Sequence, residues 1–450
     1  MYENALELLK EKRYPELRTM LMEMEAPDIA LLLEEADMDV VPRIYRILPK
    51  ELASETFAEM DPDMQEMLIK SFSDNELGEV IEEMFLDDMV DLIEEMPASL
   101  VKRILRVASP DSRKSINELL NYPDDSAGSI MTIEFVDFKK HITVKEAFDI
   151  LRKTAPDKET VYTCYVTDAR RHLIGVVTVK DLLLAPYDEI IENIMDTGII
   201  YNYTHDDKEE VARDIEKYGF LAMPIVDNET RLVGIVTVDD AMEVIQEEAE
   251  EDFAIMAAVT PSEDAYFKTS VWAHSKNRIL WLLILMLSST FTGIIITNFE
   301  DAMNALLVSF IPMLMGTGGN CGSQSSAMIV RGLATEEIKL KDFFAVFFKE
   351  LRIALLVGVV LAIANTARIW VMYGLIYKDS DIDIWLLSIA VGLTLIGVVV
   401  LSKILGCILP MLAKKVNLDP AIMASPLITT IVDTCAVLLY FNIALWIIPL

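Results

Sequence analysis

Hydrophobic residues in the C-terminal part of the chain form long, nearly uninterrupted runs. Five such stretches follow Lys276, at about Ile279–Ile296, Ala302–Val330, Phe343–Tyr373, Ile384–Leu412 and Ala421–Leu450. Each is long enough to cross a hydrocarbon layer of about 30 Å, which takes about 20 helical residues. Buried helices of a soluble protein are the alternative, but five such runs in succession argue against it. We therefore predict an all-α membrane domain with five spans over residues 276–450, in contact with a lipid bilayer.

Charged residues between these stretches predict their orientation. Lys and Arg gather before the first stretch, between the second and third, and between the fourth and fifth, whereas the two other loops are acidic. Positively charged loops remain on the cytoplasmic side. We therefore expect a multi-pass protein of the plasma membrane with a cytoplasmic N-terminus and an extracellular C-terminus. Lys403 falls near the cytoplasmic end of its stretch, where its side chain could reach the interface.

One carboxylate interrupts the fifth stretch. Asp433 lies well away from either end of it, and a carboxylate at that depth is costly unless it faces a polar cavity or a partner. An Asp that hydrogen-bonds two helices is one interpretation, and a cation site is the other. The cation site is favoured because no deep Lys or Arg offers an obvious partner.

The second stretch contains an unusual polar segment. Between Met315 and Gln324 it holds four glycines together with Asn320 and Ser323. Tight helix packing would explain the glycines, whereas a water-filled path lined by backbone carbonyls would explain glycines and amides together.

Two prolines could add carbonyl oxygens to such a path. Pro312 and Pro426 could each free a carbonyl by breaking a helical hydrogen bond. Pro426 is followed by Thr429, Thr430 and Asp433 along one face. An all-oxygen lining of this kind suits a hard cation.

An internal repeat occupies residues 130–245. The segment 174–181, IGVVTVKD, matches the segment 233–240, VGIVTVDD. Short β-branched runs alternate with helical patterns around both copies, which predicts two α/β units at about 126–188 and 189–245. In each copy the Thr and Asp could simply cap the helix that follows.

A second repeat, with a period near twelve, covers residues 49–120. Its blocks begin near a turn or an N-cap residue and carry apolar residues at helical spacing. We predict a superhelical stack of short helices inside an acidic, α-helical N-terminal domain over residues 1–125. The methionines of the stack are expected in its core rather than at a cofactor site: Met60, Met64, Met67, Met84, Met89 and Met96.

Charge separates the two parts of the chain. The protein has 72 acidic and 39 basic residues, a formal net charge of −33, and a mean hydropathy of +0.35. Only 11 of the acidic and 12 of the basic residues lie at or beyond Lys276, so the negative excess belongs to the first 275 residues. This excess argues against nucleic acid as a partner. Four cysteines and four histidines without metal-ligand spacing, and no nucleophile elbow or phosphate loop, argue against an enzyme.

Six acidic residues crowd the ten positions from Glu243 to Asp252. A solvated helix face is the usual explanation for such a run. Alternatively, divalent cations could neutralise it and dock it against the helical stack, where Asp87, Asp88 and Asp91 lie together. Repulsion without metal and attraction with it would create a two-state element that a cation can bias.

The order of these parts resembles the MgtE family of magnesium channels, over essentially the whole chain. The most specific motifs are GGNCGSQ (318–324), followed by VRGLA (330–334), and DP (419–420) with ASPLITTIVDT (424–434). The resemblance implies a helical N-terminal domain, tandem CBS domains, a long acidic connecting "plug" helix over residues 246–275 and five spans. It also implies a homodimer whose central pore closes when cytosolic Mg2+ binds between acidic surfaces.

The resemblance further implies roles for single residues. The implied metal ligands are Asp433 with Thr429 in the pore; Glu251, Asp252 and Asp419 at its inner mouth; Asp240, Glu243 and Glu248 at the CBS end; and Asp87, Asp88 and Asp91 in the helical domain. Some members bind ATP in the CBS region, which implies Thr178 and Asp181, with Thr237 and Asp240 as their counterparts. Asp240 is claimed by both the nucleotide and the metal.

The expected function is therefore a magnesium-selective channel for Mg2+ uptake that closes when cytosolic Mg2+ is bound. An ion-coupled secondary transporter of Mg2+ or another divalent metal, such as Co2+ or Mn2+, is the alternative. A CBS-regulated anion channel is disfavoured, because the deep ionisable group is a carboxylate.

Overall fold

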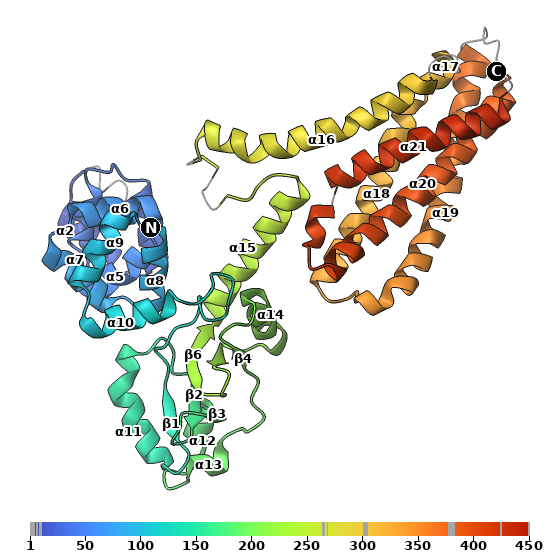
Figure 1. Ribbon diagram of the computed structural model, residues 1–450. Coiled ribbons are helices and arrows are strands. Elements are labelled where there is room, and N and C mark those ends of the chain that lie inside the picture. The colour runs from blue at the N-terminus through green and yellow to red at the C-terminus, as the bar shows by residue number, and fades with distance from the viewer. Residues whose placement is uncertain are drawn as a thin grey trace. The chain divides into compact units, whose positions relative to one another are not determined.

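The computed structural model describes residues 5, 8, 11–262, 266–267, 269–299, 305–376, 383–423 and 425–448. The chain divides into two compact units, Met1–Gln246 and Glu247–Leu450. Each unit is described by itself (Figure 1).

The first unit begins with a stack of short helices. They are α2 (Tyr14–Leu21), α3 (Ala26–Glu34), α4 (Val41–Tyr45), α5 (Lys50–Ala58), α6 (Pro62–Ser71), α7 (Asp74–Glu83), α8 (Leu86–Glu95), α9 (Ala98–Val107) and α10 (Pro110–Leu119). Helices α5 to α10 follow the twelve-residue blocks one for one, which confirms the predicted stack. The first residue of each block is the N-cap, and Ser73 and Ser109 accept capping hydrogen bonds from Glu76 N and Ser112 N.

The methionines of the stack lie in its core, as predicted. Met60, Met64, Met84, Met89 and Met96 are buried, and Met67 is partly buried against the same cluster. Unbranched side chains fill irregular gaps between short helices.

Two similar α/β units follow. The first contains β1 (Asp137–Lys139), α11 (Val144–Thr154), β2 (Thr163–Thr167), β3 (Leu173–Thr178), α12 (Val179–Leu184) and α13 (Ile191–Ile194). The second contains β4 (Asn202–Tyr203), α14 (Lys208–Tyr218), β5 (Ala222–Val226), β6 (Leu232–Thr237) and the start of α15 (Val238–Met256). Each sheet has three strands, with a parallel first pair and an antiparallel second pair. The predicted duplication is confirmed.

One hydrophobic cluster joins the helical stack to the second α/β unit. It runs from Leu17 of α2 through Ile116 of α10 to Met223 of β5 and Val244 of α15. Shared burial of this kind fixes the stack against the second repeat.

The acidic connecting helix is shorter than the predicted span of residues 246–275. Helix α15 ends at Met256, and the described residues from 257 to 270 are not helical. Ala258 adopts a positive φ of 54°, and Thr260 precedes Pro261, which disfavours the helical conformation. These residues stop the helix before the first apolar stretch.

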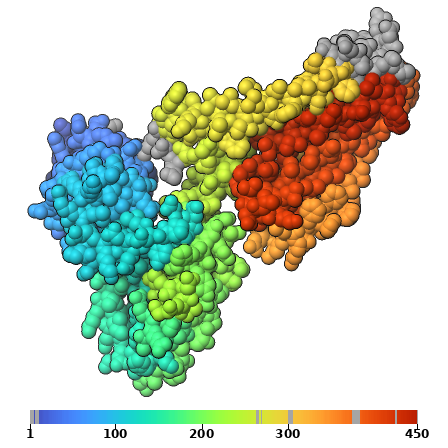
Figure 2. All heavy atoms as spheres, in the orientation of Figure 1, coloured from blue at the N-terminus to red at the C-terminus, as the bar shows by residue number. Residues whose placement is uncertain are grey.

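Helices make up most of the second unit. They are α16 (Val271–Phe299), α17 (Ala305–Val308), α18 (Ile311–Ala334), α19 (Phe343–Ile369), α20 (Ile384–Lys415) and α21 (Ser425–Ile447), with a π-helical extension at Trp370–Ile376 and 3-10 turns at Leu340–Asp342 and Pro420–Met423. Figures 1 and 2 show α16 lying along α21. Among the described residues, three helical segments are long and apolar enough to cross a membrane: Val271–Phe299, Ile384–Lys415 and Pro420–Ile447. The predicted count of five spans is therefore not confirmed.

Helix ends in this unit differ from the prediction. The second stretch was expected to begin at Ala302, which lies outside the described residues, and within the described part it is broken between α17 and α18. Pro312 and Pro426 therefore stand in the first turns of α18 and α21, where a proline removes no helical hydrogen bond. Their expected role in freeing carbonyls is wrong. Within the described part of this unit, Pro410 lies in the interior of a helix, α20.

Candidate metal centre and cation path

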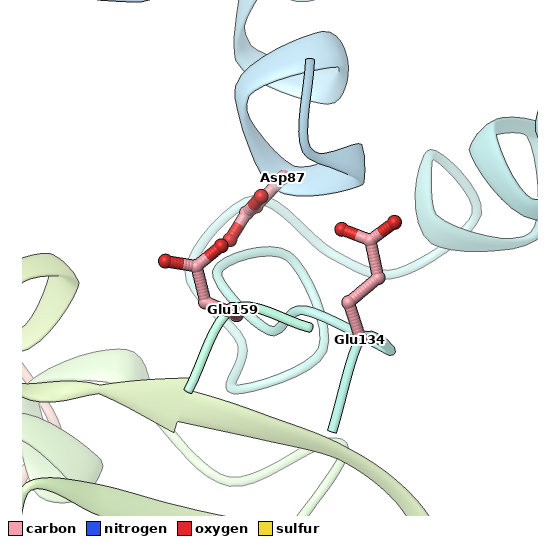
Figure 3. A group of neighbouring side chains, drawn as sticks. All are labelled: Asp87, Glu134 and Glu159. Carbon is pink, nitrogen blue, oxygen red and sulfur yellow. The ribbon is translucent and has the colours of Figure 1, made fainter. Parts of the chain in front are cut away.

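Three carboxylates from separate parts of the first unit converge (Figure 3). Asp87 stands in the first turn of α8, Glu134 precedes β1, and Glu159 precedes β2. One oxygen of each lies within 4.8 Å of the others. Figure 3 shows Asp87 and Glu159 directed toward one another, with Glu134 beside them. This arrangement could hold one cation through oxygen ligands.

Backbone hydrogen bonds hold the two glutamates in place. The Leu86 N–H, at the N-terminus of α8, donates to Glu134 Oε2 at 3.1 Å. The Glu159 N–H donates to the Glu134 carbonyl at 3.0 Å. The unsatisfied N–H groups of a helix start attract a carboxylate, so α8 itself draws Glu134 to the site.

The cluster carries more negative charge than its surroundings neutralise. Burial, followed by the charges of Asp88, Asp240 and Glu159, raises the pKa of Asp87 well above its usual range. Burial and neighbouring carboxylates also raise the pKa of Asp88 to about 7 and that of Glu159 to about 7. Glu159 Oε2 is buried without a hydrogen-bond partner in the part of the chain that the structure describes. A bound cation would relieve this repulsion.

The predicted ligands of the first unit fall into the same acidic region. Asp88 and Asp240 lie within electrostatic range of Asp87, and Asp91 lies within range of Glu243. Glu134 and Glu159 were not predicted. They stand in irregular segments without periodicity, so only the folded chain brings them to Asp87.

The Thr and Asp of both α/β repeats cap helices, as their pattern allowed. Thr178 Oγ accepts from the Asp181 N–H at 3.2 Å, and the Asp181 carboxylate accepts from the Thr178 N–H at 3.0 Å. In the second repeat the Thr237 N–H donates to Asp240 Oδ2 at 3.3 Å. The reciprocal pair of bonds at the start of α12 and the bond at the start of α15 hold these side chains in place.

The ligands predicted at the inner mouth stand on two elements of the second unit. Glu251 and Asp252 lie on α15, with Glu251 exposed and Asp252 half-buried, and Glu248, which was predicted at the CBS end, is half-buried on the same helix. Asp419 Oδ1 accepts from the Ala421 N–H at 2.7 Å and so begins the turn before α21. Their joint binding of an ion stays a prediction.

The carboxylate of Asp433 is poorly satisfied. Its side chain is half-buried on α21, and its Oδ1 atom is buried without a hydrogen-bond partner among the described residues. Thr429, the other predicted ligand, lies one turn earlier on the same helix. A carboxylate oxygen without a hydrogen-bond partner, one helical turn from the Thr429 hydroxyl, is suited to bind a cation or the water molecules that hydrate it.

The glycines of α18 let α20 and α21 approach closely, as tight packing predicts. A Cβ on Gly318 would lie 2.8 Å from Val432, one on Gly319 2.8 Å from Thr429, and one on Gly322 2.7 Å from Ile428. Asn320 and Gln324 are exposed on α18. The motif therefore places the α18 backbone directly against the turn that carries Thr429.

Lys403 does not reach toward an interface as predicted. It is buried in α20, about 18 Å from the helix end at Lys415. Its ammonium group lies near Glu350 of α19 and Ser325 of α18. Lys403 is thus a deep basic residue, but its partners are Glu350 and Ser325 and not Asp433.

Comparison with known proteins agrees with this layout. The family model MgtE, described as a divalent cation transporter, matches residues 311–443. The MgtE intracellular N domain matches residues 24–125, and CBS domains match residues 127–188 and 191–247. The magnesium transporter MgtE of Thermus thermophilus is 35% identical over 97% of this chain and 96% of its own length. The chain belongs to the MgtE family.

Other MgtE proteins support the same assignment. The magnesium transporter MgtE of Bacillus subtilis is 32% identical over 97% of this chain and 95% of its own length. The solved cytosolic domain of the Mg2+ channel MgtE in complex with ATP is 35% identical, with a TM-score of 0.51, and covers 54% of this chain and 100% of that chain. The solved soluble part of a magnesium transporter is 32% identical, with a TM-score of 0.52, over 55% and 98%. MgtE relatives are thus named as transporters, which is a non-enzyme class.

Proposed function

We propose that this MgtE protein is a magnesium-selective channel for Mg2+ uptake that closes when cytosolic Mg2+ binds its acidic surfaces. The observation that carries the proposal is the unsatisfied carboxylate of Asp433, set in an apolar helix against the glycine motif of α18. The relatives named as magnesium transporters support the choice of ion.

The chemistry of Mg2+ fits this site. Mg2+ prefers oxygen ligands and gives up its water reluctantly. In a homodimer, two Asp433 carboxylates related by a twofold axis would hold a largely hydrated ion, with Thr429 beside them. Such a site binds well enough to select and weakly enough to release. A negative membrane potential drives the ion inward with about 2.3 kcal/mol per charge per 100 mV.

Closure would begin at the carboxylates of Asp87, Glu134 and Glu159. Without Mg2+ they repel one another and the nearby Asp88 and Asp240. With Mg2+ bound they hold the helical stack against the α/β repeats. Glu243, Glu248, Glu251, Asp252 and Asp419 would extend this response toward the pore.

ATP is the proposed second ligand of the CBS region. The solved relative contains ATP, and Thr178 with Asp181 supplies the matching residues in the first repeat. In the second repeat Thr237 stands with Asp240, whose charge also acts on the acidic cluster. Asp240 therefore couples the two ligands in this proposal.

The proposed assembly is a homodimer in the plasma membrane with five spans in each subunit. The N-terminus would be cytoplasmic and the C-terminus extracellular, in agreement with the basic loops of the sequence.

Asp433→Ala tests the path. We expect that this variant no longer takes up enough Mg2+ to support the growth of cells that lack other magnesium uptake systems, because the carboxylate that holds the ion is gone. Asp383→Ala is a control, since Asp383 caps the start of α20 through Trp385 N. Normal uptake by Asp433→Ala would contradict the assignment. Single-channel currents too large for a transport cycle would separate a channel from a coupled transporter.

A further inference from the structure

Three polar side chains from three helices meet inside the second unit. The Lys403 ammonium of α20 donates to Ser325 Oγ of α18 at 3.1 Å, and the Ser325 hydroxyl donates to Glu350 Oε2 of α19 at 2.6 Å. Lys403 Nζ lies 3.9 Å from the same Glu350 oxygen. The Lys403 and Glu350 side chains are only 7% and 12% exposed. One hydroxyl thus bridges a buried ion pair.

Stability alone does not explain this cluster. Desolvating two charges offsets most of what their attraction returns, so a buried ion pair adds little over apolar side chains of similar size. Buried polar groups are best known for fixing which of several packings a set of helices adopts.

The glycine surface of α18 leaves its position along the helix axis poorly defined, so another contact must fix it. The helix approaches α20 so closely that a Cβ on Gly406 would lie 2.4 Å from the Gly322 carbonyl oxygen. Surfaces of glycine pack tightly but carry few side chains that define a position along the axis. Ser325 stands one turn after Gly322. A slip of one residue would move it by about 1.5 Å and turn it by about 100°, away from both charges.

We propose that Ser325, Lys403 and Glu350 form a register lock that positions α18 for cation passage. In the locked register Gly319 faces Thr429 of α21, one turn before Asp433. The neighbouring Ser326, which donates to the Met423 carbonyl at 2.8 Å, holds the same register from the other side. The three are positioning residues that act on the path through α18. The inference rests on the proposed role of Asp433.

The test measures Mg2+ flux into proteoliposomes that contain a magnesium-sensitive dye, together with the Mg2+/Na+ permeability ratio and the melting temperature of the purified protein. Ser325→Ala removes the bridge and leaves both charges paired. The double variant Glu350→Gln/Lys403→Met removes both charges at once. Ser402→Ala is the matched control, because the buried Ser402 hydroxyl, among the described residues, donates its hydrogen bond to the Val398 carbonyl of its own helix at 2.6 Å.

We expect flux to fall about tenfold in Ser325→Ala and in the double variant, which corresponds to a shift of about 1.4 kcal/mol against the locked register. The melting temperature should stay near the wild-type value in the double variant, because no unpaired charge is left buried, and should fall only slightly in Ser325→Ala. The permeability ratio should change in both, and Ser402→Ala should match wild type. Wild-type flux and permeability ratio in the double variant would overturn the lock, because the two charges would then merely compensate each other. If the double variant does not fold, wild-type flux in Ser325→Ala is by itself enough to overturn the lock.

Asp433→Ala in the same assay separates the two proposals. An inactive Asp433→Ala with fully active Ser325→Ala and double variants would overturn the lock and leave the path standing. Normal flux in Asp433→Ala would overturn the path and the lock with it.

Discussion

At the scale of single residues, the acidic cluster of the first unit makes the stability of the fold depend on pH. Asp88 and Glu159 ionise near pH 4 in an unfolded chain, with ordinary pKa values of 3.8 and 4.5, but burial and like charges raise their pKa values to about 7 in the fold. The folded state holds more protons between these values. Its stability without metal therefore falls as the pH rises from about 4 to about 7.

Glu159→Gln should remove part of this dependence. Without Mg2+ at pH 8, we expect slower amide hydrogen exchange in α8 than in the wild type, because a buried charge that repels Asp87 has gone. Mg2+ should then slow exchange less than it does in the wild type. Mass spectrometry of the full-length protein in detergent measures both effects. Glu55→Gln, at an exposed position of α5, is the control. Equal exchange in the wild type and Glu159→Gln would contradict the proposal that Glu159 repels Asp87 and binds Mg2+ together with it.

At the scale of helices, the sequence predicted what depends on local pattern. The twelve-residue period and its N-cap residues predicted α5 to α10 one for one, and the repeated strand-turn-helix pattern predicted both α/β units. These features lie within a few turns of chain, where capping and apolar spacing decide the structure.

Features that depend on contacts between distant helices were not predicted. Glu350 and Lys403 are 53 positions apart, and the hydropathy pattern predicts each of their helices without showing which residues of the two come into contact. Glu134 and Glu159 likewise join Asp87 only after the stack packs on the repeats. Pattern placed Lys403 near the cytoplasmic end of its helix, and it gave neither the depth of this residue nor the face on which its partners lie. Three-dimensional packing supplies that information.

Close packing of α18 against α20 predicts a contrast between two glycines. Gly406→Ala would place a Cβ 2.4 Å from a backbone oxygen, which cannot move as a side chain can. We expect a destabilisation of about 1–3 kcal/mol and loss of Mg2+ flux. Gly316→Ala, on α18 with nothing within 4 Å of the added atom, should retain flux and gain about 1 kcal/mol of helix propensity. Melting temperature and dye-based flux measure the pair, and equal behaviour of the two variants would contradict the packing.

At the scale of the whole molecule, negative charge and hydrophobicity are divided between two units. The residues from Lys276 onward hold 11 acidic and 12 basic residues, whereas the first 275 hold nearly all the negative excess. A compact form of these first 275 residues repels itself. Cations that bind the compact form must stabilise it by mass action, by about 2.7 kcal/mol at 100 times their dissociation constant.

Magnesium should therefore protect the acidic segment around Ala249 from proteolysis in the full-length protein. We expect slower cleavage in millimolar Mg2+ than in EDTA, and an intermediate rate for Asp87→Asn, because one ligand of the first cluster is lost. Na+ at equal ionic strength controls for general screening. Equal cleavage with and without Mg2+ would contradict the proposal that Mg2+ binds these acidic surfaces.

The twelve-residue stack also has a consequence for how the protein is made. Helices of residues 49–120 pack on the helix two places along the chain, α5 on α7, α7 on α9 and α8 on α10, and contacts over such short separations form quickly. At about 5–20 residues per second of synthesis, the stack can fold while the ribosome is still translating the apolar helices. Its methionine core is then already hidden when those helices emerge. The order of parts along the chain thus lowers the risk of aggregation during biogenesis.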